Sequence, residues 1–378
     1  MLPRRSFPPT LPIASSDGAD PVADAGDATG VGYRAAGVDI DAGAEAVRRI
    51  GPLVRSTYRP GVMGDIGGFG GLFDLARSGY RDPILVSATD GVGTKAEIAR
   101  LTGRLDTIGR DLVAMCVDDL VCSGAAPLFF LDYLAVGRLD PEAVEQLVTG
   151  IAAGCSEAGC ALIGGEMAEH PGVMAADQFD LVGFAVGAVE REDVMDGSAA
   201  APGDLLVAID SPNLRSNGFS LARRIVFDVA ARSLDDPAWE GSEGTLADEL
   251  LAPSVIYAAA VVAVLAAHEV HAVAHVTGGG LPGNLPRVLG EGVDAVVDPM
   301  AWEVPRIFRE LQDMGGVSDA EMARVFNLGV GMVLVVPPSE ADGVVATLAS
   351  GARPARVIGE LVAGTGTVAY SGAGGMGS

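Results

Sequence analysis

The chain has 378 residues, which is too long for one compact core and predicts two domains. Hydrophobic residues make up 49% and charged residues 20%, so sizeable apolar cores are expected. The formal net charge of −25 argues against general attraction to nucleic acid or to an anionic membrane. An anionic substrate must therefore be captured by a local pocket.

Both ends differ in composition from the rest of the chain. Residues 1–32 are rich in Pro, Ala, Gly, Ser and Asp and predict a disordered extension, and the glycine-rich residues 371–378 predict a flexible tail. No apolar run approaches the length of a membrane span, and the N-terminus lacks the apolar region of a signal peptide. The cysteines match no zinc pattern and predict buried free thiols in a reducing cytoplasm: Cys116, Cys122, Cys155 and Cys160.

Predicted strands and helices alternate along the chain, which indicates an α/β or α+β fold. A break rich in Gly, Ser, Ala and Pro at 196–203 separates an N-terminal domain (33–198) from a C-terminal α/β domain (199–370). In the first domain we predict helices at 38–54, 106–124 and 140–159, and strands at 83–88, 128–137, 161–163 and 179–189. In the second we predict strands at 205–209, 271–276, 293–298, 329–336 and 355–361, and helices at 217–229, 254–267 and 279–289.

The stretch Asp90-Gly91-Val92-Gly93-Thr94-Lys95 contains the only lysine in the chain. An ammonium is a compact point charge, so it fits a narrow pocket that a planar guanidinium cannot enter. A carboxylate, two glycines and a hydroxyl beside it are suited to a phosphate and its metal ion. The alternative is an ordinary turn.

Three acidic residues lie on the next predicted helix. Asp111 and Asp118 are seven residues apart and share one face, and Asp119 adjoins Asp118. The helix is apolar nearly all round, so unpaired carboxylates there would be costly, and Mg²⁺ ligation is favoured over a solvated acidic face.

Three further segments are candidates for ligand binding. Glu166 follows the predicted strand at 161–163 through two glycines, where α/β proteins often place ligands, although a polar loop is the alternative. Thr277-Gly278-Gly279-Gly280 runs from a strand into a helix and suits a phosphate. The glycine-dense segment 61–71 is either a linker or a lid over a nucleotide.

Together these segments resemble the phosphoribosylformylglycinamidine cyclo-ligase family over about residues 33–360. The resemblance rests on 36–43, 67–73, 90–95, 106–109, 111–115, 127–133, 216–218 and 275–280. It implies the two-domain fold of that family, with N-terminal sheets pairing across a cytoplasmic homodimer. It also implies an ATP- and Mg²⁺-dependent ring closure in purine biosynthesis, with formylglycinamidine ribonucleotide as substrate.

The same resemblance suggests roles for individual residues. The catalytic candidates are Lys95, Asp119 and Arg215, and the metal candidates are Asp90, Asp118, Asp119 and Glu166. The nucleotide-binding candidates are Gly67, Gly68, Phe69, Gly70, Asp90, Gly91, Gly93, Thr94, Lys95, Thr277, Gly278, Gly279 and Gly280.

Three positions depart from the family pattern. Asp118 stands where Asn is common, Met167 where Thr is usual, and Arg215 where His precedes Ser-Asn-Gly. Two alternatives stay open: another ATP-using enzyme of the superfamily, or, because of Met167 and Arg215, a nucleotide-binding regulator with impaired catalysis. A selenophosphate synthetase would need a reactive cysteine near its N-terminus, and the first cysteine here is Cys116.

Overall fold

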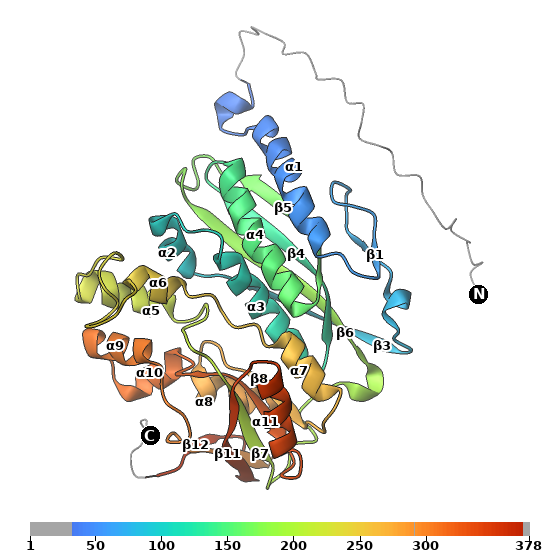
Figure 1. Ribbon diagram of the computed structural model, residues 1–378, viewed down its shortest axis with the longest axis vertical. Helices are drawn as coiled ribbons and strands as arrows, with labels where there is room; N and C mark the ends of the chain where they lie inside the picture. Colours follow the sequence, from blue (N-terminus) through green and yellow to red (C-terminus); the bar gives the residue numbers. More distant parts are fainter. Residues whose placement is uncertain (1–31, 291, 373–378) are drawn as a thin grey trace.

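The computed structural model describes residues 32–290 and 292–372 and folds them around two β-sheets (Figure 1). The predicted extension before Gly32 and the predicted tail beyond Gly372 lie outside the described residues. In the part of the chain that is described, no helix is long and apolar enough to cross a membrane.

The first sheet has four strands in the order β3-β6-β4-β5. β4 and β5 are parallel and the other neighbours are antiparallel. The strands are β3 (Pro83–Gly91), β4 (Ala126–Val136), β5 (Ala161–Glu169) and β6 (Phe179–Glu190). Three helices pack together on one face of this sheet: α1 (Ile40–Ser56), α3 (Ile108–Val121) and α4 (Pro141–Ala158).

Local sequence explains where these helices begin and how closely they pack. Asp140 caps α4 by accepting a hydrogen bond from the Glu142 N–H at 3.0 Å, and Pro141 occupies the first turn. A side chain at Gly109 would place its Cβ 2.3 Å from the backbone nitrogen of Ile151, so glycine permits α3 to lie directly against α4.

The second sheet has six strands in the order β12-β9-β11-β7-β10-β8. Its strands are β7 (Leu205–Asp210), β8 (Ala272–His275), β9 (Val293–Val297), β10 (Val330–Val336), β11 (Ala355–Ala363) and β12 (Val368–Tyr370). The helices of this half are α5 (Phe219–Arg223), which continues as a π-helical segment over Arg224–Val229, α6 (Leu246–Leu251), α7 (Ala258–Leu265), α8 (Gly280–Asn284), α9 (Arg306–Gly315), α10 (Asp319–Val325) and α11 (Ala341–Ser350). Short 3-10 turns lie at Arg34–Ala36, Leu75–Ser78, Arg191–Asp193 and Leu285–Val288.

One apolar core joins the two halves. α7 contacts α3, α4 and α11, and the core continues from α3 through α7 to one face of β7 and β10. The C-terminal half of α3 therefore lies where the two halves meet, which places its acidic residues beside β8.

The structure corrects several predictions of the sequence analysis. The chain forms a helix, α2 (Lys95–Thr102), directly after the Asp90 loop, and a hairpin of β1 (Val62–Met63) and β2 (Leu72–Phe73) closes the glycine-dense segment. Glu166 does not follow the end of a strand, because β5 continues to Glu169 along the parallel partner β4. Gly165 permits this close pairing, since a Cβ there would lie 2.0 Å from Oδ1 of Asp132.

Candidate active site

Lys95 is fully enclosed by acceptors at the first position of α2. Its Nζ donates to Oδ1 of Asp111 at 2.9 Å, to the carbonyl of Arg215 at 3.0 Å and to the carbonyl of Ala252 at 2.9 Å. Only 1% of the side chain is exposed. Burial lowers the pKa of Lys95 and the neighbouring Asp111 opposes that shift. Since three protons meet three acceptors, Lys95 does not reach a phosphate in this conformation.

Asp118 is equally buried and is paired with Arg215. Its Oδ2 accepts from Nη2 of Arg215, and its Oδ1 accepts from the backbone N–H groups of Tyr257 and Ala258, each at 2.9 Å. The guanidinium also stacks 4.7 Å from the centre of the Tyr257 ring. The structure therefore presents Asp118 to a protein cation, and not to a metal ion, and encloses Arg215 away from solvent.

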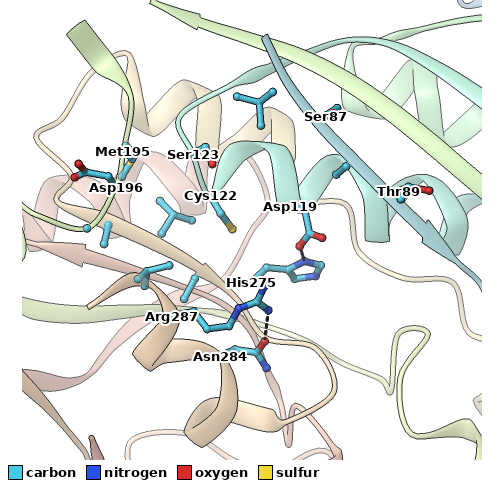
Figure 2. A pocket seen from close by; sticks show the side chains of 17 residues that line it. Ser87, Thr89, Asp119, Cys122, Ser123, Met195, Asp196, His275, Asn284 and Arg287 are labelled. Atoms are coloured by element: carbon cyan, nitrogen blue, oxygen red, sulfur yellow. Dashed lines mark hydrogen bonds and ion pairs between the residues drawn. The ribbon is translucent and has the colours of Figure 1, made fainter. Parts of the chain in front are cut away.

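Asp119, one residue further along α3, turns toward open space. Its side chain is 48% exposed, and its Oδ1 lies 2.8 Å from Nδ1 of His275 on β8 (Figure 2). Asp90, near the end of β3, faces the same region. Burial raises the pKa of Asp90, and the charge of Asp119 raises it further. The sequence analysis named both carboxylates among four metal candidates, but it gave His275 no role.

A cavity of about 460 Å³ opens beside Asp119, between β3 of the first sheet and β8 of the second. Its polar lining includes Ser87 and Thr89 from β3, and Asn284 and Arg287 from the segment after β8. Arg287 donates to Oδ1 of Asn284 at 3.3 Å, as Figure 2 shows. Asp119 and Asp196 also line the cavity, with Arg287 between them in Figure 2, so it combines two carboxylates with one guanidinium.

The turn Thr277–Gly280 leads from β8 into α8, close to His275. The amide of Asn284 donates to the carbonyls of Thr277 at 3.3 Å, Gly278 at 3.2 Å and Gly280 at 2.9 Å, which fixes the shape of the turn. Gly280 has a φ of +59°, and a Cβ there would lie 1.9 Å from the carbonyl oxygen of Ala323. This position requires glycine.

The glycine-dense segment forms a second cavity, of about 600 Å³, at the other edge of the first sheet. Its lining includes Gly67, Gly68, Phe69 and Gly70, apolar residues of α1, and Glu166. The structure thus brings the predicted lid and Glu166 together.

Glu166 is nonetheless separated from Asp90. Across the sheet, Asp90 pairs with Gly183, Gly183 with Asp132, and Asp132 with Gly165, so three strand spacings intervene. That separation is about 14 Å, so one metal ion does not bind Glu166 together with Asp90.

Asp132, which the sequence analysis gave no role, lies in the same row and lines the second cavity. Burial raises its pKa to about 7. The signal that could have identified it is a single carboxylate in the otherwise apolar stretch from Leu128 to Val136.

Comparison with known proteins decides the family. Residues 78–189 match the model "AIR synthase related protein, N-terminal domain", and residues 201–371 match its C-terminal counterpart. A relative from Geotalea daltonii, named phosphoribosylformylglycinamidine cyclo-ligase, is 51% identical over 329 residues, which cover 87% of this chain and 94% of the relative. A relative of the same name from Citrifermentans bemidjiense is 50% identical over 333 residues, covering 88% and 95%.

The chain belongs to the phosphoribosylformylglycinamidine cyclo-ligase family. This confirms the predicted family and the predicted enzyme class, a ligase of purine biosynthesis. Neither alternative from the sequence analysis gains support from these matches.

Solved structures confirm the mixed α/β fold class. Thiamine-monophosphate kinase from Stenotrophomonas maltophilia K279a superposes with a TM-score of 0.62 at 19% identity, covering 86% of this chain and 96% of the kinase. Hydrogenase maturation protein HypE in complex with ATP superposes with a TM-score of 0.61 at 17% identity, covering 86% and 89%. At these identities the likeness concerns the fold alone.

Proposed function

We propose that the region around Asp90 and Asp119 is where this member of the cyclo-ligase family uses ATP to convert formylglycinamidine ribonucleotide into 5-aminoimidazole ribonucleotide. The observation that carries this proposal is that Asp119, paired with His275, lines a cavity between the two sheets, with the carboxylate of Asp90 close enough to feel its charge. Such an ATP-dependent step of purine synthesis belongs in the cytoplasm.

The donor set at this position suits Mg²⁺. The ion is usually held in proteins by one or two carboxylates and completes its shell with water and substrate phosphates. The charge of Asp119 contributes to the raised pKa of Asp90, and a divalent cation between them would offset that repulsion. When bound there, Mg²⁺ would neutralise the phosphates of ATP.

In the proposed reaction, the γ-phosphoryl group of ATP is transferred to the formyl oxygen of the substrate, and ADP is released. The amidine nitrogen then attacks the activated carbon, the C–O bond breaks, phosphate leaves, and loss of a proton gives the imidazole. The protein accelerates these steps mainly by positioning the reactants and stabilising charge. Asp90 and Asp119 would hold Mg²⁺ at the nucleotide end, and Lys95 and Arg215 act as positioning residues beneath them.

The glycine-containing segments complete the proposed site. The loop 67–70 and the apolar residues of α1 would enclose the base of the nucleotide in the second cavity. Arg287 would bind the 5′-phosphate of the substrate, because a guanidinium favours that anion in a chain of net charge −25. The turn 277–280 would lie beside it, with the N–H groups of Gly278 and Gly280 donating within the protein, to Oδ1 of Asn217 and to the carbonyl of Thr277.

The assay that tests this function supplies MgATP and formylglycinamidine ribonucleotide to the full chain and follows ADP and aminoimidazole ribonucleotide together. We expect both products in equal amounts. ADP without aminoimidazole ribonucleotide would contradict the proposed reaction.

Arg287→Gln should raise KM for the ribonucleotide roughly tenfold with kcat little changed, since a charged phosphate contact is lost. Arg324→Gln, which changes an exposed arginine on α10, is the matched control.

We also propose that two chains pair through the face of the first sheet that the helices leave uncovered. Gly183 faces α3, because a Cβ there would lie 3.1 Å from Leu112, so its neighbours Val182 and Phe184 face away. The uncovered face carries exposed apolar side chains on three strands: Leu85, Tyr133, Val182 and Phe184. A contiguous apolar surface of this kind marks an interaction site, and a second copy presents the same strands in the same order.

Sedimentation velocity tests this pairing. The wild-type chain should sediment as a dimer, and Phe184→Asp should shift it to a monomer because a charge would be buried between the sheets. Val357→Asp, which changes an exposed apolar residue of β11, should leave the dimer intact. A monomeric wild-type chain at micromolar concentration would refute the pairing.

A further inference from the structure

Two of the three departures from the family pattern touch one another. Asp118 and Arg215, which are 97 residues apart in the chain, form an ion pair between Oδ2 and Nη2 in which both side chains are 0% exposed. Asp118 belongs to α3 of the first half, and Arg215 to the segment after β7 of the second half. The pair therefore spans the junction between the two halves.

Each charge requires the other. A buried carboxylate or guanidinium without its partner is strongly destabilising, whereas a neutral pair at the same place carries no such cost. An asparagine at position 118 would leave Arg215 without a counter-charge. A histidine at position 215 would leave Asp118 with backbone donors alone.

The backbone at Arg215 indicates that this position is held under strain. Its φ is +59°, in the left-handed region that residues with a side chain rarely adopt. The Arg215 N–H donates to Oδ1 of Asn213 at 2.9 Å, and its carbonyl accepts from Nζ of Lys95 at 3.0 Å. These contacts keep the conformation and aim the guanidinium between Asp118 and His275.

The guanidinium connects the ion pair to the proposed catalytic carboxylate. Nη1 of Arg215 contacts Nε2 of His275, and Nδ1 of His275 lies 2.8 Å from Oδ1 of Asp119. Arginine can only donate, so Nε2 accepts, and Nδ1 carries the ring proton and donates it to Asp119. The ring of contacts closes on itself, because Asp118 and Asp119 are neighbours on α3.

We propose that Asp118 and Arg215 act as one coupled unit, which fixes the orientation and tautomer of His275 and through it the position of Asp119. The positioning of Asp119 for nucleotide use rests on the proposed function, whereas the coupling of the two charges does not. Arg215 is thus a positioning residue. In this chain the arginine at 215 and the acidic residue at 118 occur together and contact one another.

A double-mutant cycle on the full chain tests the coupling. Asp118→Asn and Arg215→His should each lower kcat/KM at least tenfold and lower the urea midpoint of unfolding. The double variant should recover most of both losses, since it removes the two charges together. If the two losses multiply in the double variant, the residues act independently and the proposal fails.

A measurement on the wild-type chain covers the case in which a single variant does not fold. The chain has four histidines. Each of three variants removes one of them and so identifies the imidazole ¹⁵N signals of that residue: His170→Gln, His268→Gln and His271→Gln. The signals that remain in all three variants belong to His275. We expect a proton on Nδ1 and an accepting Nε2. A proton on Nε2 would overturn the inference. Loss of the cyclo-ligase reaction with this spectrum and the coupling intact would instead refute the proposed function alone.

Discussion

Replacing Lys95 by methionine is expected to destabilise the protein by about 3–5 kcal/mol, because a buried carboxylate loses its partner. Methionine matches the length of the side chain, so the change creates little cavity. Asp111, which is 0% exposed, keeps its contacts to Ser254 but faces no cation. The carbonyls of Arg215 and Ala252 lose their donor as well. Equilibrium unfolding in urea, followed by circular dichroism, measures the loss.

A second substitution separates charge from packing. Asp111→Asn in the Lys95→Met background keeps an oxygen for Ser254 but carries no charge, so it should restore much of the lost stability. A double variant as unstable as Lys95→Met alone would mean that the uncompensated charge is not the cause.

The uniqueness of Lys95 predicted a pocket for an ammonium beside a phosphate, whereas the structure surrounds its Nζ with acceptors of the protein itself. The acceptors are a carboxylate of α3 and two backbone carbonyls, those of Arg215 and Ala252, which lie more than 100 residues further along the chain. Local sequence patterns carry no information on such distant carbonyls. A phosphate and a set of carbonyls also favour the same cation.

Most helices and strands of the fold could be predicted from apolar periodicity, because long elements with one buried face repeat at fixed spacing. The short elements could not. The hairpin around the glycine-dense segment has two-residue strands, too short to alternate, and β12 has three residues. The extension of β5 through Gly164 and Gly165 depends on its partner β4, and sequence alone does not reveal the pairing.

Asp118 and Asp119 illustrate the limit of sequence reasoning at the site. Neighbouring residues of a helix point about 100° apart, so one can be buried while the other faces solvent. The sequence analysis identified both as ligands for a metal. In the structure, Asp118 forms an ion pair with Arg215, whereas the side chain of Asp119 is 48% exposed. This difference arises only once the second half of the chain packs against α3.

Asp119→Asn is expected to lower kcat/KM by roughly 10²–10³, the range seen when one preorganised electrostatic contact to a transition state is removed. The amide oxygen of asparagine can still accept from Nδ1 of His275, so the local geometry should remain. What is lost is the negative charge that, with Asp90, would hold Mg²⁺. The apparent Mg²⁺ constant should therefore rise, and calorimetric binding of MgATP should weaken with it.

Asp313→Asn, a change of the same type at an exposed position on α9, is the matched control and should leave turnover and the Mg²⁺ titration as in the wild type. The Asp119→Asn variant should also unfold at the wild-type urea concentration, because a half-exposed carboxylate contributes little to stability. This separates it from the Asp118 variant, in which stability and turnover fall together. An Asp119→Asn enzyme with an unchanged Mg²⁺ titration would remove Asp119 from the metal site, and Asp90 alone could not then hold the nucleotide as proposed.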